Sequence, residues 1–469
     1  MPQNFLGCDR DQELLLPPSL KEWLPEGHLA WFVLEAVAEL DLDAFYGSYR
    51  VDGHGRAAHD PAMMVALLIY GYASAVRTSR GIERHCHDDV AFRVITANQA
   101  PDHATIARFR VRHETAIAGL FGSVLELCAR AGMVRVGVVA VDGTKIAAAA
   151  THHATRTYQQ IAEEILEEAA RLDAAEDELY GDARGDELPE GLRTSGDRRK
   201  WIREAKQAID AKRAAEAKPV ARDRGDRLAE CKVRLEQDWE LERRVVCEHA
   251  AGLERGIASD GTRRIFGATH NIKPYPLTDE PAGKINVTDP DSRKLKTTRG
   301  WVQGYNAQAV VTLDQIVIAA DISTESLDTA SLQPMIEAAS AELLAAGVTE
   351  RPRIALADAG YWKNDAIDAL LGHGIGILIA PDADRRKEPR PGRRGGRYDF
   401  TRRVLATETG KQLYLKRQGC VEPVFGQIKS NRGANRFLRR GRSAVRSEWR
   451  LLTATHNLLK LHRHQVALA

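Results

Sequence analysis

The chain has few cysteines and no long hydrophobic segment. Its six cysteines are scattered over 469 residues without a CxxC pair, so the sequence predicts free thiols in a reducing compartment. The most apolar run, residues 65–76, is shorter than the roughly 20 residues that a membrane-spanning helix needs. The first residues show no basic stretch followed by an apolar one, which argues against a secretory signal peptide. We therefore expect a cytoplasmic protein with no membrane partner.

The composition excludes further classes of protein. Hydrophobic residues make up 43% of the chain and charged residues 28%. These values are ordinary for a soluble globular protein and unlike a disordered, collagen-like or disulfide-scaffold chain. At roughly 100–200 residues per domain, the length allows two to four domains, or one core with large insertions.

The net charge of +2 conceals a strong asymmetry. Residues 385–469 contain 22 Lys or Arg against 5 Asp or Glu, a net of +17, which leaves −15 for the rest of the chain. A basic block of this size is typical of a surface that binds phosphate. A solvated basic tail without a specific partner would have the same composition.

The first 130 residues are predicted to be helical. Asp60 and Pro61 begin one helix as its N-cap and first residue. Asp102 caps another helix, which carries Arg108 and Arg110. A tight turn followed by a basic helix resembles a helix-turn-helix. A plain helical bundle with a charged outer face would show the same pattern, so both interpretations stay open.

Residues 156–280 form a charged stretch without a catalytic motif. Within 156–250 there are 19 basic and 24 acidic residues among strong helix formers, which predicts one or two long exposed helices. The sequence therefore divides into a helical N-terminal domain (1–130), an α/β domain (131–155 and 281–469) and a charged, largely helical insertion (156–280).

The α/β domain alternates between strands and helices, as in a sheet covered by helices. Asp142 and Asp358 each directly follow a short apolar strand, Asp328 caps a helix, and Glu422 lies in the first turn of another helix. The strands are expected over 136–141, 303–312, 315–323, 353–357 and 376–380, and the helices over 329–346, 364–371, 421–430 and 449–462.

Carboxylates at strand ends are candidates for a metal site. In open α/β sheets, ligands bind outside the carboxyl ends of the strands, where Asp142 and Asp358 are expected. Converging carboxylates repel each other, and Mg²⁺ or Mn²⁺, which prefer oxygen ligands, offset that repulsion. An Asp after a strand is, however, often only a turn former. Asp321 and Asp382 compete for the second position and Glu448 for the third, so the pattern alone leaves the set open.

Several motifs together resemble one family. The segments Val139-Ala-Val-Asp142-Gly-Thr-Lys, Ala357-Asp358-Ala-Gly-Tyr361 and Val421-Glu422-Pro-Val-Phe-Gly-Gln-Ile-Lys429 are similar to the three catalytic stretches of bacterial insertion-sequence DDE transposases, and residues 98–110 and 303–310 resemble other parts of that group. The resemblance implies an RNase H-like mixed sheet with helices on both faces, preceded by a helical DNA-binding domain and interrupted by the insertion. It also implies that Asp142, Asp358 and Glu422 are the catalytic residues and hold two Mg²⁺ or Mn²⁺ ions.

Many members of that family carry a Tyr-x2-Arg-x3-Glu-x6-Lys signature. Here Tyr414 and Arg417 match its start, and Glu422 and Lys429 match its end, but four residues instead of three separate Arg417 from Glu422. Seven residues are about two helical turns, so Glu422 and Lys429 are expected on one face, with Lys429 toward a phosphate. The residues expected to contact DNA are Tyr414, Arg417, Lys429, Arg432, Arg436, Arg439, Arg108 and Arg110.

The resemblance implies a transposase that cleaves the ends of its own mobile element and joins the freed 3′-hydroxyl to target DNA. Its partners would be double-stranded DNA and a second copy of the chain in the DNA complex, in a bacterial cytoplasm at the nucleoid. Two alternatives remain: a metal-dependent nuclease that cuts without joining, and an inactive DNA-binding protein of the same fold. Terminal inverted repeats in the DNA that flanks the coding region would favour transposition.

Overall fold

The computed structural model describes residues 19–49, 58–180, 223–254, 278–297, 300–325, 327–381 and 395–468. The chain divides into two compact units, one made of residues 1–150 with 291–469 and the other of residues 151–290. Asp382, a competing candidate for the second carboxylate, lies outside the described residues. In the part that is described, none of the helices has both the length and the apolar character needed to cross a membrane.

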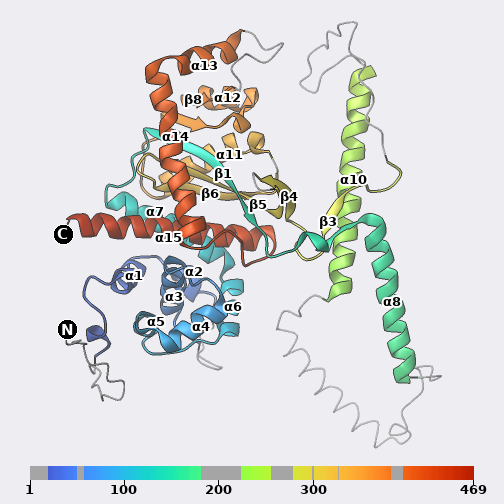
Figure 1. The fold of residues 1–469 in the computed structure, drawn as a ribbon, viewed down its shortest axis with the longest axis horizontal. Helices are drawn as coiled ribbons and strands as arrows, with labels where there is room; N and C mark the ends of the chain where they lie inside the picture. Colours follow the sequence, from blue (N-terminus) through green and yellow to red (C-terminus); the bar gives the residue numbers. More distant parts are fainter. Residues whose placement is uncertain are drawn as a thin grey trace, which may run out of the picture. The chain divides into compact units, whose positions relative to one another are not determined.

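The larger unit begins with a bundle of helices (Figure 1). Two caps are as the sequence predicts, because the Asp60 carboxylate accepts a hydrogen bond from the Met63 amide and the Asp102 carboxylate accepts one from Thr105. The helices are α1 (Leu29–Ala38), α2 (Asp43–Tyr46), α3 (Pro61–Ala73), α4 (Ser79–Asp88), α5 (Val90–Ile95), α6 (His103–Arg112) and α7 (Glu114–Arg130).

A mixed sheet follows the bundle in the same unit. Its strands are β1 (Val138–Ala147), β4 (Arg293–Thr297), β5 (Gly300–Thr312), β6 (Val317–Ser323), β7 (Ile354–Ala357) and β8 (Gly376–Ile379). The order is β4-β5-β1-β7-β8, and β6 also pairs with β5. The pairs β1–β5, β4–β5 and β5–β6 are antiparallel, whereas β1–β7 and β7–β8 are parallel. This sheet confirms the expectation of a mixed α/β architecture.

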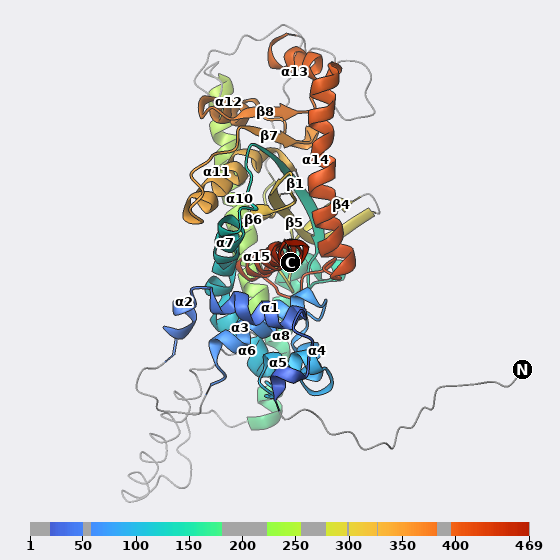
Figure 2. The same cartoon turned by 90° about the vertical axis from the view of Figure 1, so that its left-hand side faces the viewer.

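Helices cover the sheet, with α11 and α14 on opposite sides of it (Figure 2). Val421 and Val424 of α14 are fully buried, as are Ala339 and Leu343 of α11 to within 1%. The helices and turns of this part of the chain are η4 (Asp328–Ala330), α11 (Leu332–Ala345), η5 (Ala359–Tyr361), α12 (Asn364–Gly372), α13 (Gly396–Ala406), α14 (Glu408–Gly426), the π turn η6 (Gln427–Asn431) and α15 (Arg442–Leu468).

Three local expectations are wrong. The strand before Asp142 does not end there, since β1 continues to Ala147 along its antiparallel partner β5. Asp328 does not cap the following helix; α11 begins after Ser331, and the Asp328 carboxylate accepts hydrogen bonds from two other side chains. Glu422 lies near the end of α14 and not in its first turn, because that helix already begins at Glu408.

The smaller unit contains the long helices expected of the insertion. They are α8 (Tyr158–Tyr180) and α10 (Arg224–Glu254), accompanied by η2 (His152–Ala154) and the paired strands β2 (Thr155–Thr157) and β3 (Lys284–Asn286). A small cluster of buried side chains joins them: Ile161, Leu228, Cys231, Leu235 and Ile285.

Candidate active site

The sheet brings Asp142 and Asp358 to the same level. Strands β1 and β7 run parallel, and their last pair joins Ala140 to Leu356. Asp142 and Asp358 each lie two residues beyond this pair. Asp142 is still within β1, whereas β7 ends at Ala357, directly before Asp358. The parallel pairing therefore aligns two carboxylates that are far apart in the sequence.

Asp142 is largely buried and paired with a cation. Its side chain is 18% exposed, and Oδ2 accepts a hydrogen bond of 2.9 Å from Nη1 of Arg417. Burial raises the pKa of Asp142 to about 6; Arg417 opposes that rise, while the negative charges of Asp358 and Asp328 add to it. Three acidic side chains therefore influence one another here.

Asp358 is the N-cap of the short turn η5, and the last residue of that turn is hydrogen-bonded to β5. Its Oδ1 accepts a hydrogen bond of 2.9 Å from the Gly360 amide at the start of η5. Three residues after Asp358, Tyr361 is fully buried, and its hydroxyl donates to Oε1 of Gln308 in β5. Burial raises the pKa of Tyr361 well above its usual value, and the nearby carboxylates raise it further, so its hydroxyl keeps its proton.

Arg417 supplies the positive charge of the site. Only 8% of the residue is exposed, and its Nε is buried without a hydrogen-bond partner. Burial lowers the pKa of Arg417, but Asp142, Tyr414 and Asp358 raise it by more, so its pKa is raised overall. Its guanidinium group thus lies in the field of both aspartates.

Glu422 does not join the two aspartates in this structure. Its side chain is exposed. It follows Arg417 by five residues, which turns an α-helix by about 140° beyond one full turn, so the two side chains leave α14 in different directions. Among the described residues, no three Asp, Glu, His or Cys side chains come together in a geometry that could hold a metal ion.

The donor set nevertheless suits a divalent cation in two respects. Asp142 and Asp358 offer oxygen ligands, which Mg²⁺ and Mn²⁺ prefer. The pKa of Asp142 stays raised by burial and by the charges of Asp358 and Asp328 although Arg417 lowers it, so this one guanidinium group does not neutralise the cluster fully. The residues present therefore fit a small divalent cation held by Asp142 and Asp358.

Comparison with known proteins identifies two regions of the chain. A family model described as "Transposase DDE domain" matches residues 274–458, and one described as "Transposase domain (DUF772)" matches residues 18–112. The chain is an insertion-sequence DDE transposase. Neither a curated protein nor a solved structure matches it. Asp358 and Glu422 lie within the matched DDE region, whereas Asp142 lies between the two matched regions.

The transposase therefore acts as a nuclease and transferase on DNA. Its basic residues differ in how accessible they are to that DNA. Arg108 is exposed on α6 and hydrogen-bonds Thr105, on the same helix. Arg110 and Arg432 are buried, with exposed fractions of 7% and 4%, and both donate to backbone carbonyl groups. Their burial, like that of Arg417, argues against direct phosphate contact in this conformation.

Other predicted contacts are engaged but accessible. Arg436 is exposed and donates to the Ala148 carbonyl, and Arg439 forms an ion pair of 2.6 Å with Glu114. Tyr414 is half-buried on α14, beneath the guanidinium group of Arg417.

Lys429 reaches the strand that carries Asp142. Its Nζ lies 3.0 Å from Oγ1 of Thr144 and 3.2 Å from the carbonyl oxygen of Lys145. Lys429 lies within the π turn η6, which begins at Gln427, after Glu422. The chain between the two residues is therefore not a regular α-helix, and the two-turn spacing expected for this pair does not apply. π turns are frequent at functional sites.

The alternative carboxylates have other partners. Asp321 pairs with Arg446. Glu448 is fully buried against Arg77 and also accepts hydrogen bonds from the amides of Leu438 and Arg439. Glu448 therefore ties the N-terminal helices to the chain that leads into α15.

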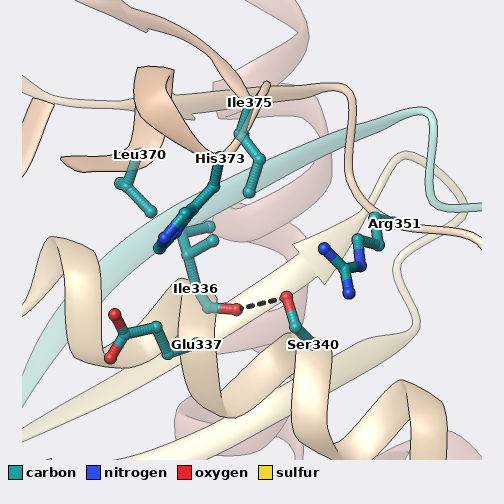
Figure 3. A pocket seen from close by; sticks show the side chains of 7 residues that line it. All are labelled: Ile336, Glu337, Ser340, Arg351, Leu370, His373 and Ile375. Atoms are coloured by element: carbon teal, nitrogen blue, oxygen red, sulfur yellow. Dashed lines mark hydrogen bonds between the residues drawn. The ribbon is translucent and has the colours of Figure 1, made fainter. Parts of the chain in front are cut away.

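The sequence analysis missed the polar network beneath the aspartates. Asn306 and Gln308, each 1% exposed, donate to Asp328. Two amides at alternate positions of an otherwise apolar strand were the available signal, since such residues share one face of a sheet. A separate pocket of about 230 Å³ lies between α11 and α12, where Glu337, Ser340, Arg351 and His373 contribute its polar groups (Figure 3). None of its lining residues belongs to the site.

Proposed function

We propose that the transposase cleaves the ends of its insertion sequence and joins the resulting 3′-hydroxyl to target DNA. The observation that carries the proposal is the alignment of Asp142 with Asp358 by the parallel strands β1 and β7, together with the buried Arg417 that pairs with Asp142. In chain order the sheet has four strands joined by antiparallel pairs (β1, β4, β5 and β6), then α11, the parallel strand β7, α12 and the parallel strand β8. That order supports an RNase H-like fold for this part of the chain.

The proposed cofactor is Mg²⁺ or Mn²⁺, with two ions per site. Such a pair stabilises the attacking and leaving oxygens of an in-line displacement at phosphorus. Asp142 and Asp358 would hold the ions, and Asp142 must first lose the proton that its raised pKa favours. Glu422 belongs to the proposal through the family resemblance; it is carried by the same helix as Arg417.

The DNA is proposed to reach this site from the side of α14 and the exposed arginines. Arg436 and Arg108 are accessible at their positions, and each phosphate that a protein cation neutralises makes binding more dependent on salt. Binding of element ends by the N-terminal helices, and a dimer in the DNA complex, are part of the same proposal.

The test compares wild type with Asp358→Ala and with Asp365→Ala, an exposed aspartate seven residues further on. Each is incubated with DNA that carries the gene's own flanks, in Mg²⁺ or Mn²⁺, and nicks and joined products are mapped. End-specific nicks and joined products in wild type and Asp365→Ala, but not in Asp358→Ala, support the proposal. Nicks without joining favour the nuclease, and binding without either product leaves an inactive DNA-binding protein.

A further inference from the structure

A second polar layer lies beneath the catalytic aspartates. Successive residues of a strand point to opposite faces of a sheet. Asp142 points toward Arg417 of α14, so Gly143 faces the other side. A Cβ atom there would collide first with Nε2 of Gln308, and it would lie 2.7 Å from Oδ1 of Asn306 and 2.9 Å from Oδ1 of Asp328. Gly143 therefore leaves the space that these side chains fill.

Asp328 is held there by two buried amides. Its Oδ1 accepts hydrogen bonds of 2.7 Å from both Nδ2 of Asn306 and Nε2 of Gln308. Both amide side chains are 1% exposed, and a buried amide without a partner is costly. These hydrogen bonds hold the Asp328 carboxylate in place and give both buried amide groups an acceptor.

The same network holds the turn that carries Asp358. Gln308 donates through Nε2 to Asp328 and accepts through Oε1 from Tyr361, the last residue of η5. On the other side, a Cβ at Gly360 would lie 3.0 Å from Oδ1 of Asp358 and 3.6 Å from Oδ2 of Asp328. Asp328 therefore lies close to Gly360 in η5 and is also linked, through Gln308, to Tyr361 at the end of that turn.

We propose that Asp328 is a positioning residue of the transposase, which fixes Asp358 through Gln308 and Tyr361. The turn η5 has only three residues, so its geometry depends on what its ends contact. A metal ligand loses affinity when its supporting hydrogen bonds are removed, typically by about ten- to 100-fold. This inference rests on the proposed function, because it assigns to Asp358 the role of a metal ligand.

Asp328→Ala and Asp328→Asn separate positioning from charge. Alanine removes the acceptor for both amides, whereas asparagine keeps a carbonyl oxygen at Oδ1, removes the negative charge and places an NH2 group at the position of Oδ2. Gln308→Leu breaks both links of the network at their common residue. Asp314→Ala is the matched control, because Asp314 pairs with Arg135 at the opposite end of the β5–β6 hairpin.

The first measurement is hydrogen–deuterium exchange of the full chain without metal or DNA. We expect faster exchange of the backbone amides of residues 358–362 in Asp328→Ala and Gln308→Leu, and wild-type exchange in Asp328→Asn and Asp314→Ala. A uniform increase over the whole sheet would show general destabilisation and overturn the proposal. Unchanged exchange in Asp328→Ala would overturn it as well.

The second measurement is Mn²⁺ binding to the same proteins, followed by electron paramagnetic resonance, with Asp142→Ala as the reference for a lost ligand. Asp328→Ala is expected to bind Mn²⁺ about ten- to 100-fold more weakly than wild type, with most of the affinity restored in Asp328→Asn. If Asp142→Ala abolishes binding but Asp328→Ala does not weaken it, this inference fails and the proposed metal site stands. If neither variant affects binding, the proposed metal site itself fails.

Discussion

The ion pair between Arg417 and Asp142 gives the most direct test of the electrostatics of the site. In Arg417→Gln the Asp142 carboxylate loses its partner while it stays largely buried. Removal of one partner of a buried ion pair costs about 3–5 kcal/mol. The larger unit has about 330 residues, so at an unfolding entropy of about 2.1 cal/mol/K per residue this corresponds to a decrease in Tm of roughly 4–7 °C at pH 8.

The effect should depend on pH in a defined direction. The pKa of Asp142 is raised from 3.8 to about 6 in the folded chain, so its ionisation costs stability as the pH rises between these values. Since Arg417 limits that cost, its removal raises the pKa of Asp142 further. The stability difference between wild type and Arg417→Gln should therefore be small at pH 5 and large at pH 8.

Thermal unfolding at both pH values, with and without Mn²⁺, measures these quantities. Lys416→Gln, a change at the exposed neighbouring residue, is the control for loss of a positive charge from α14. At a concentration 100 times its Kd, a ligand stabilises the folded state by about 2.7 kcal/mol. Mn²⁺ should stabilise Arg417→Gln at least as much as wild type, because the ion replaces the missing charge. Equal losses at pH 5 and pH 8, or weaker rescue of the variant by Mn²⁺, would refute the reasoning.

Three further predictions concern other parts of the same unit. Because Mn²⁺ competes with a proton on Asp142, its affinity should fall about ten-fold per pH unit below pH 6 in calorimetric titrations. Gly143→Ala places a methyl group against Nε2 of Gln308 and against side-chain oxygens 2.7 and 2.9 Å away, and it should lower stability by about 1–3 kcal/mol in chemical denaturation; Gly419→Ala, where the space is open, should not. Glu448→Gln leaves Arg77 buried with its charge unpaired and should destabilise the unit by about 3–5 kcal/mol in the same assay.

The strands could be predicted from local sequence, whereas the choice of Asp142 and Asp358 over Asp321 and Asp382 came from the family resemblance. A short apolar run between turn residues indicates a buried strand without knowledge of the rest of the fold. The extension of β1 past Asp142 could not be predicted, because it depends on how far the antiparallel partner β5 runs. Asp358 needed no such information, since β7 ends directly before it.

The hydrogen bonds of Asp328 to β5 could not be predicted, because its position before a helix favours a different role. An Asp before a helix is most often its N-cap, but here its carboxylate accepts hydrogen bonds from Asn306 and Gln308, about 20 residues earlier in the chain. Only the sheet brings these groups together. The arginines present the same difficulty, because their charge predicts a surface that binds phosphate, while burial, which removes Arg110 and Arg432 from that surface, follows from tertiary packing.

The spacing between Arg417 and Glu422 explains why the structure presents a cation to Asp142 instead of a third carboxylate. With three intervening residues, as in the family signature, two side chains on an α-helix lie about 40° apart, and with the four found here they lie about 140° apart. The π turn that follows holds one residue more than an α-helical turn, and it can absorb the extra residue before Lys429 contacts β1.

Deletion of Gly419, which is exposed and has open space around it, should therefore move Glu422 toward the face of Arg417. We expect tighter Mn²⁺ binding without DNA than in wild type, and regular α-helical hydrogen bonding in place of the π turn. Gly419→Ala keeps the spacing and should bind Mn²⁺ like wild type. If the deletion variant folds with an unchanged Tm but binds Mn²⁺ no more tightly than Gly419→Ala, the helical phase of Glu422 is not what keeps it from the two aspartates.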